Sequence, residues 1–183
     1  MLLRRLALLM IWLLLPAEFC TAANDPAAIL REANRLSNLF NWADAGPLYA
    51  QAEKSFAAAG DKRDALYAKF GRIRGEMETL NLPETSDYLG SELQTPLLRH
   101  DLRLRLMCLI VKGDIDGEID SEPASADWRE ALSVAKKLHD RKWESRASAE
   151  LGFQEFVQGD VGAAMKAVGT ALITAHNTGD VGA

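Results

Sequence analysis

The sequence predicts an all-α fold, a right-handed superhelical stack of antiparallel helix pairs. From about residue 25 onward, apolar residues recur with the period of an amphipathic helix, and no stretch alternates apolar and polar residues over the length of a strand. Only 7% of the residues are aromatic while alanine is abundant, and small residues suit closely packed helices better than sheets. The breaks between helical segments are short, which makes neighbouring helices antiparallel.

Length and composition indicate one globular domain behind a leader. The chain has 183 residues, of which 48% are hydrophobic and 26% charged, a composition far from that of disordered chains. The net charge is −5 and no stripe of Lys or Arg stands out, so nucleic acid is not an expected partner. No linker is long enough to divide residues 24–183, which we expect to form a single helical repeat domain.

Residues 1–23 have the pattern of a secretory signal peptide, with a positive start, an apolar run and small residues before a cleavage site after Ala23. The apolar run of residues 6–15 is shorter than the ~20 residues that cross a bilayer. We therefore expect export to the periplasm or the medium, with no membrane attachment after cleavage. The alternative is a leader that is retained as an anchor. Cys20 follows Glu and Phe, which do not suit lipid attachment.

Eight helical segments are expected in order. The first opens at Asn24-Asp25-Pro26, a capping pair followed by proline at the first helical position. Proline-containing breaks at residues 81–84 and 95–96 separate the third, fourth and fifth segments. Residues 113–126, rich in Gly, Asp, Glu and Ser, are expected as the one loose region. The segments cover approximately residues 26–39, 42–60, 62–80, 85–94, 98–115, 127–139, 142–157 and 162–176.

Three of these helices share one stripe, with a large residue first and alanine second, at steps of three, four and three residues. At about 100° per residue, the four positions fall within an arc of roughly 80°. Because a bulky side chain would hold a neighbouring helix away, we expect the alanines at close helix contacts. The stripes are Trp42, Ala45, Tyr49 and Ala52; Trp128, Ala131, Ala135 and Leu138; and Val161, Ala164, Val168 and Ala171.

The helices between the stripes carry glycine at matching places, Gly71 and Gly152, and a Gly-Asp pair recurs at the turns. The pairs are Gly60-Asp61, Gly159-Asp160 and Gly179-Asp180. Glycine can adopt the left-handed backbone that ends a helix, and aspartate can cap the next one. The final NTGDVGA repeats the earlier QGDVGA, so we expect an array cut within a repeat, the amino-terminal part of a longer protein. The alternative is a natural end that frays.

On these residues the chain resembles the tetratricopeptide repeat (TPR) family, a solenoid of helix pairs with a 34-residue period. The stretch Leu151-Gly152 together with Ala164, Val168 and Ala171 matches the family pattern well, whereas residues 81–126 depart from its regular length. The resemblance implies a scaffold that binds a protein or peptide partner through side chains on the first helix of each pair. A generic stack of helical hairpins is the alternative for the earlier units.

Two longer stretches resemble the amino-terminal repeat region of bacterial proteins that carry a caspase-like CHAT protease domain. They are NWADAGPLYAQAEKSFAAAGDKRDALYAKFGRIR and RLMCLIVKGDIDGEID. In such proteins the catalytic dyad lies far downstream, so no catalytic residue is carried over to this chain. The resemblance implies the regulatory region of a CHAT-type cysteine peptidase, or of another signalling enzyme, whose catalytic domain would lie beyond residue 183.

No catalytic, metal-binding or cofactor-binding residues are expected in the chain itself. The three histidines are too widely spaced in the sequence to form a short metal-ligand pair. Cys108 lies in an apolar run and is interpreted as a small buried hydrophobe. Residues 114–120 alternate acidic side chains as calcium loops do, but the glycine and the closing glutamate are misplaced. We expect a solvated, acidic helix end there.

The tryptophans raise one further alternative, a platform for a sugar or a base. Trp42, Trp128 and Trp143 are the candidates. Because two of the three lie in the stripes, we expect them to pack in the core. The residues that contact a partner cannot be named from the sequence.

Overall fold

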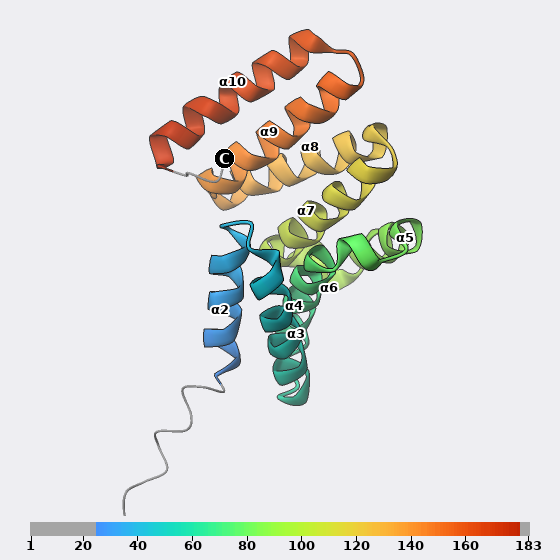
Figure 1. The fold of residues 1–183 in the computed structure, drawn as a ribbon, viewed down its shortest axis with the longest axis vertical. Coiled ribbons are helices and arrows are strands. Elements are labelled where there is room, and N and C mark those ends of the chain that lie inside the picture. Colours follow the sequence, from blue (N-terminus) through green and yellow to red (C-terminus); the bar gives the residue numbers. More distant parts are fainter. Residues whose placement is uncertain (1–24, 180–183) are drawn as a thin grey trace, which may run out of the picture.

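The computed structural model describes residues 25–179, so the expected signal peptide and the last Gly-Asp turn's Asp180 lie outside the described residues. Residues 25–179 form nine α-helices and one short 3₁₀ helix, with no strand among them, which confirms the all-α class (Figure 1). The elements are α2 (Pro26–Ser37), α3 (Trp42–Ala58), α4 (Lys62–Gly75), η4 (Met77–Thr79), α5 (Leu82–Leu93), α6 (Pro96–His100), α7 (Leu102–Ile119), α8 (Ser121–Leu138), α9 (Arg141–Val157) and α10 (Val161–Thr178).

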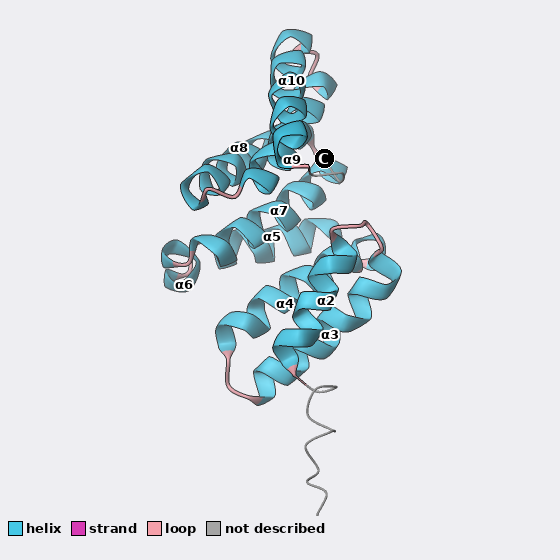
Figure 2. Ribbon diagram, turned by 90° about the vertical axis from the view of Figure 1, so that its left-hand side faces the viewer, coloured by secondary structure: helices cyan, strands magenta, loops and turns pink. Residues whose placement is uncertain are grey.

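The helices pack in neighbouring pairs that follow one another along the long axis of the molecule (Figures 1 and 2). Helix α3 packs against both α2 and α4, α8 packs against both α7 and α9, and α10 packs against α9. Helix α7 also contacts α4 and α5, and it joins the lower group of helices to the upper one. Pairwise packing is therefore shown, while a right-handed superhelix remains a prediction.

A capping side chain precedes each α-helix in the described part of the chain. In every case its oxygen accepts a hydrogen bond from a backbone N–H in the first turn, which stabilises a helix start by about 1 kcal/mol. These residues are Asp25, Asn41, Asp61, Asn81, Thr95, Asp101, Asp120, Asp140 and Asp160. The capping residues mark nine helix starts within residues 25–179, whereas the apolar period of the sequence indicated eight helical segments.

Five helices end at a residue with left-handed backbone. The left-handed residues are Phe40, Gly60, His139, Gly159 and Gly179. After the first four, the backbone N–H of the next residue donates to the carbonyl five positions earlier, at 2.9–3.0 Å, as in a Schellman turn. The turn expected from the Gly-Asp pairs therefore also occurs at His139-Asp140 and Phe40-Asn41, where no glycine marks it.

Three expected boundaries were wrong, two of them because of a local cap. Residues 113–126 are not loose, since α7 runs to Ile119, α8 begins at Ser121, and only Asp120 between them is extended. The helix expected at 98–115 is divided into α6 and α7 because Asp101 ends one and caps the other. The helix expected at 62–80 ends at Gly75 and continues as the short 3₁₀ helix.

The core consists of two apolar clusters. The smaller one holds buried residues of α2, α3 and α4, and the larger one extends from α4 through α9. The ring of Tyr67 packs against both clusters. Its position on α4 makes that helix the structural link between the two ends of the molecule.

The stripe alanines are buried in all three helices. Ala45, Ala131 and Ala164 are enclosed, as are the stripe rings Tyr49 and Trp128. Val161 and Val168 differ, because they are 52% and 48% exposed. In the described structure α10 packs against α9 on one side only, so part of its stripe faces outward.

Three glycines mark the closest helix crossings. A Cβ atom on Gly71 would collide with the ring of Tyr49, and one on Gly113 would lie 2.7 Å from the ring of Trp128. A Cβ on Gly152 would lie 2.9 Å from a methyl group of Val168. The glycine on one helix thus accommodates the large stripe residue of its neighbour.

Candidate functional site

Two cavities lie between α2, α4, α7 and α9. One, of about 230 Å³, is lined by the first halves of α4 and α7 and by the start of α9, and we call it the N-end cavity. The other, of about 330 Å³, is lined by the ends of α4 and α7, by the second half of α9 and by the α2–α3 turn, and we call it the C-end cavity. Helices α4, α7 and α9 therefore run in the same direction past both cavities.

The two cavities adjoin and together form what we call the inner groove. Arg74 lines the C-end cavity, and its guanidinium carbon lies 5.7 Å from the ring centroid of Trp143, which lines the N-end cavity. On the α9 side, Nη2 of Arg146 donates to the carbonyl of Asn38 at 3.4 Å and its guanidinium lies over Phe40. Helix α9 thereby meets the turn between α2 and α3, which are distant in sequence.

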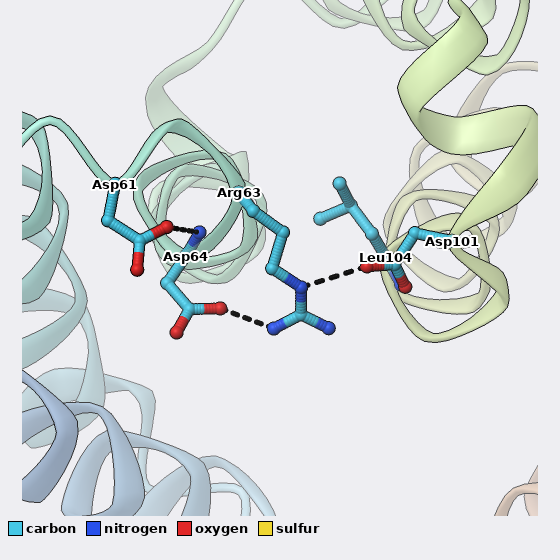
Figure 3. A network of polar contacts seen from close by, with 5 residues as sticks. All are labelled: Asp61, Arg63, Asp64, Asp101 and Leu104. Atoms are coloured by element: carbon cyan, nitrogen blue, oxygen red, sulfur yellow. Dashed lines mark hydrogen bonds and ion pairs between the residues drawn. The ribbon is translucent and has the colours of Figure 1, made fainter.

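The N-end cavity has an apolar floor and a charged mouth. Arg63 connects the starts of α4 and α7, since its Nε donates to Oδ2 of Asp101 at 2.9 Å and it also pairs with Asp64 (Figure 3). Asp101 in turn accepts from the backbone N–H of Leu104 at 2.9 Å. The hydrogen bond from Arg63 lowers the pKa of Asp101, so this cap is ionised at neutral pH.

Arg103 is the accessible cation at this end of the groove. It is exposed and lines the N-end cavity, and its side chain has no hydrogen bond or ion pair within residues 25–179. The starts of α4, α7 and α9 also meet here, and helix starts carry a partial positive charge. Asp64 and Asp140 also line this cavity, so Arg103 itself, rather than the cavity as a whole, is the group that suits an acidic side chain of a partner.

The C-end cavity combines aromatic rings with carboxylates. Four rings and four acidic side chains line it, beside a single cationic one. They are Phe40, Trp42, Trp128 and Phe153; Glu78, Asp114, Glu118 and Glu150; and Arg74. Both stripe tryptophans, Trp42 and Trp128, thus line this cavity as well as packing in the core.

Arg74 is held in this cavity by a carboxylate and two rings. It forms an ion pair with Asp114, and its guanidinium carbon lies 4.9 Å from the ring centroid of Trp42. Burial raises the pKa of Asp114, although Arg74 acts in the opposite direction. Burial likewise raises the pKa of Glu150, with a further contribution from the charge of Asp114. Within the described residues Glu150 has no hydrogen bond or ion pair.

The expectation of a solvated acidic helix end at residues 114–120 holds for Glu118 and Asp120, which are exposed, but was wrong for Asp114 and Asp116. Residues 114–119 form the last turns of α7, where Asp114 pairs with Arg74 and Asp116 pairs with Lys112. Both aspartate side chains are largely buried. Asp114 thus pairs with a residue of another helix, whereas Asp116 pairs with Lys112 one turn earlier in α7.

The groups considered for catalysis do not come together. Cys108 is buried in the larger core, its Sγ lies 3.6 Å from the carbonyl of Leu89, and burial raises the pKa of its thiol. His100, His139 and His176 are exposed at helix ends, and Nδ1 of His100 lies 2.7 Å from the carbonyl of Pro96. Among residues 25–179, no three His, Cys, Asp or Glu side chains gather as a metal site requires.

A second surface feature is the outer apolar face of α9 and α10. Its side chains are exposed, and beside them lies an apolar cavity of about 510 Å³. The exposed residues are Phe153, Phe156, Val157, Val161, Met165, Val168, Leu172 and Ile173. None of the helices in the described part is long and apolar enough to span a bilayer.

Comparison of the chain with known protein families, with curated proteins and with solved structures gives no match. The class that the fold and the site define is thus an all-α protein of paired helices with an inner groove. The resemblance to TPR and CHAT proteins remains a hypothesis that rests on the sequence motifs.

Proposed function

We propose that this chain is a non-catalytic binding module whose inner groove holds an extended segment of a protein partner. The observation that carries the proposal is the groove itself. Three helices that run in the same direction line it, its floor is partly apolar, and charged side chains without partners lie at both ends. An extended peptide suits such a surface, because apolar pockets supply affinity while charged ends set its direction.

The helix pairs support a TPR-like right-handed stack as the frame of this groove. A glycine meets a stripe residue of a neighbouring helix in three places. Gly113 and Gly152 lie against the helix that follows, and Gly71 lies against the helix that precedes it. In that arrangement the first helix of each pair faces inward, and α4, α7 and α9 hold those positions. The proposed frame includes export to the periplasm or the medium and cleavage of the leader, as the sequence predicts.

Panning a random dodecapeptide library against the purified protein tests this function. Arg103→Glu should weaken the selected peptides by about fivefold or more, because it reverses the one accessible cation at the N-end of the groove. Lys54→Glu is the matched control, since Lys54 is an exposed cation of α3 that lines neither cavity. Isothermal titration calorimetry gives the affinities. Equal effects of the two variants, or no selected peptide at all, would contradict the proposal.

A second candidate function is the regulatory region of a larger enzyme, such as a CHAT-type cysteine peptidase. The outer apolar face favours it, because exposed apolar patches of this kind mark contacts with another domain or with further repeats. Reading the open frame past Ala183 in the source DNA tests this candidate. A downstream His and Cys in a caspase-like setting would support it, and a stop after one polar capping helix would exclude it.

A further inference from the structure

The C-end cavity contains one cationic group of the protein itself, the guanidinium of Arg74. The guanidinium of Arg74 pairs with Asp114 and lies over the ring of Trp42, so a carboxylate and an aromatic face act together on one positive group. This internal pair accounts for one of the cavity's carboxylates. It leaves Glu78, Glu118 and Glu150 with no side-chain hydrogen bond or ion pair among the described residues.

The helix ends around the cavity add to its negative character. The last turns of α4 and α7 line it, and backbone carbonyls at a helix end carry a partial negative charge. Glu118 is exposed at the rim, while Glu150 is partly buried on α9. Burial and the nearby charge of Asp114 raise the pKa of Glu150, and the charge of Arg74 offsets this rise only in part.

Phe40 supplies a second aromatic face at the rim of the cavity. Its backbone is left-handed, with φ of 58°, although its side chain is 59% exposed and gains little from burial. Strained residues of this kind are concentrated at binding sites. The guanidinium of Arg146 lies 5.7 Å from the centroid of this ring, so the ring is already used as a surface for a cation.

We propose that the C-end cavity binds one basic side chain, lysine or arginine, of the segment that occupies the inner groove. This inference rests on the proposed function. The positive group lies between Glu118 and Glu150, and its aliphatic stem lies against Phe40. A volume of about 330 Å³ is at the lower end of the range for small-molecule sites, so the cavity suits a single side chain. The partner then binds in one direction, with its basic residue at the C-end.

An NMR titration of the full chain with single-residue probes tests the inference. The probes are Nα-acetyl-lysine amide and Nα-acetyl-arginine amide, with Nα-acetyl-glutamine amide as the neutral control, and the signals are the indole N–H groups of Trp42 and Trp128. Saturable shifts are expected with the two cationic probes, at a Kd on the order of millimolar. The neutral probe should give no saturable shift.

Carboxamide variants identify the groups that bind the probe. Replacing both glutamates, by Glu118→Gln and Glu150→Gln, should weaken the cationic probes about fivefold or more. The matched control, Glu84→Gln with Glu122→Gln, makes the same change of net charge at exposed positions away from both cavities and should leave the affinity unchanged. Glu118 is exposed, so Glu118→Gln alone should keep the fold. This single variant replaces the double variant in the titration if the double variant fails to fold.

The outcomes separate this inference from the proposed function. Selected peptides that bind while neither cationic probe shifts the indole signals would overturn the inference and leave the peptide-binding groove standing. Equal shifts with the neutral probe, or equal losses in the two variant pairs, would also overturn it. Saturable cationic shifts that depend on Glu118 and Glu150 support the inference even if no library peptide is selected.

Discussion

At the scale of single residues, Gly71 decides how closely α3 and α4 approach. A glycine inside a helix normally lowers stability by roughly 0.5–1 kcal/mol relative to alanine. At Gly71 the preference is reversed, because a methyl group would collide with the ring of Tyr49, itself buried between α2 and α4. Tyr49 is fixed further by its hydroxyl group, which donates to Oδ1 of Asn34 at 2.7 Å.

Gly71→Ala should therefore lower the free energy of unfolding by about 1–3 kcal/mol through overpacking. Gly169→Ala is the matched control in α10, where no atom lies within 4 Å of the added methyl group, and it should raise stability by up to about 1 kcal/mol. Denaturation by urea, followed by circular dichroism, measures both. If the two alanine variants change stability in the same direction, the close α3–α4 crossing is wrong.

His139 is the residue for which the turn chemistry makes the clearest stability prediction. It has φ of 54°, where three glycines end other helices, and its side chain is exposed. His139→Gly should raise the free energy of unfolding by about 0.5–1 kcal/mol, because glycine adopts this backbone without strain. The same substitution at His176, inside α10, should lower stability by up to about 1 kcal/mol. A loss of stability at position 139 would show that the imidazole has a role that its contacts do not reveal.

At the scale of elements, a buried charged cluster connects α7 to α8 and α5. Nζ of Lys112 lies 3.0 Å from Oδ2 of Asp127 and also pairs with Asp116, which accepts from the hydroxyl group of Ser86. Burial, together with the interaction with Asp116, raises the pKa of Asp127 to about 7. The pKa of Asp116 is lowered, with hydrogen bonds from Lys112 and Ser86 outweighing its burial.

Stability should consequently fall as the pH rises from about 4 to 7, because native Asp127 keeps a proton that the unfolded chain has already lost. Asp127→Asn should make this slope shallower, leaving the contributions of Asp114 and Glu150, whose pKa values burial also raises. It should raise stability at pH 8 by on the order of 1–2 kcal/mol. Asp116 titrates below this window, and Asp87→Asn, an exposed change on α5, serves as the control. Urea denaturation at several pH values gives the slopes. Parallel slopes for the wild type and Asp127→Asn would contradict the raised pKa.

The contact between α9 and α10 makes the prediction on which the repeat interpretation most depends. Ala164 is buried, and its carbonyl would lie 3.2 Å from a Cβ atom on Gly152. Ala164→Arg should lower the free energy of unfolding by about 3 kcal/mol, since it combines overpacking with an unpaired charge. Met165→Arg, one position along on the exposed side of α10, should change stability little. Equal melting temperatures for the two arginine variants would mean that the stripe is assigned to the wrong face.

Most helices could be predicted from the sequence because their signals are local. The caps at Asp25 and Asp61 and the glycine turns at residues 60 and 159 act within a few residues, and the structure places helix ends there. The errors at 98–115 and 113–126 have one cause. Asp101 and Asp120 look like ordinary acidic residues within or beside an apolar run, and only the extended backbone at each shows that they divide two helices.

The inner groove could not be predicted, because its residues share no local pattern. Arg103 lines the N-end cavity, whereas Glu118 and Glu150 line the C-end cavity, and both cavities form only when α4, α7 and α9 surround the same groove. The stripes indicated which faces pack, but not which faces remain open. Phe40 is the one groove residue that the sequence could have indicated. It directly precedes the capping Asn41, at the position where a helix-ending turn needs a left-handed backbone, and an aromatic residue is unusual there.

At the scale of the whole molecule, the two ends differ in how their apolar surface is covered. Helix α3 is packed between α2 and α4, whereas α10 packs mainly against α9 and exposes Leu172 and Ile173. Apolar side chains gathered on one face favour association, because removing them from water releases roughly 25 cal/mol per Å². The α9–α10 end is thus the part of the molecule expected to contact other protein surface.

Leu172→Glu combined with Ile173→Glu should therefore reduce self-association of the purified protein. We expect the association constant from sedimentation equilibrium to fall at least about tenfold, since two exposed apolar side chains are replaced by like charges that repel across a shared face. Gln51→Glu combined with Lys54→Gln, which makes the same change of net charge on exposed α3, should leave it unchanged. Because both replaced residues are exposed, the monomer should keep its melting temperature. Association that persists in the double glutamate variant would place the contact elsewhere, with the inner groove as the next surface to examine.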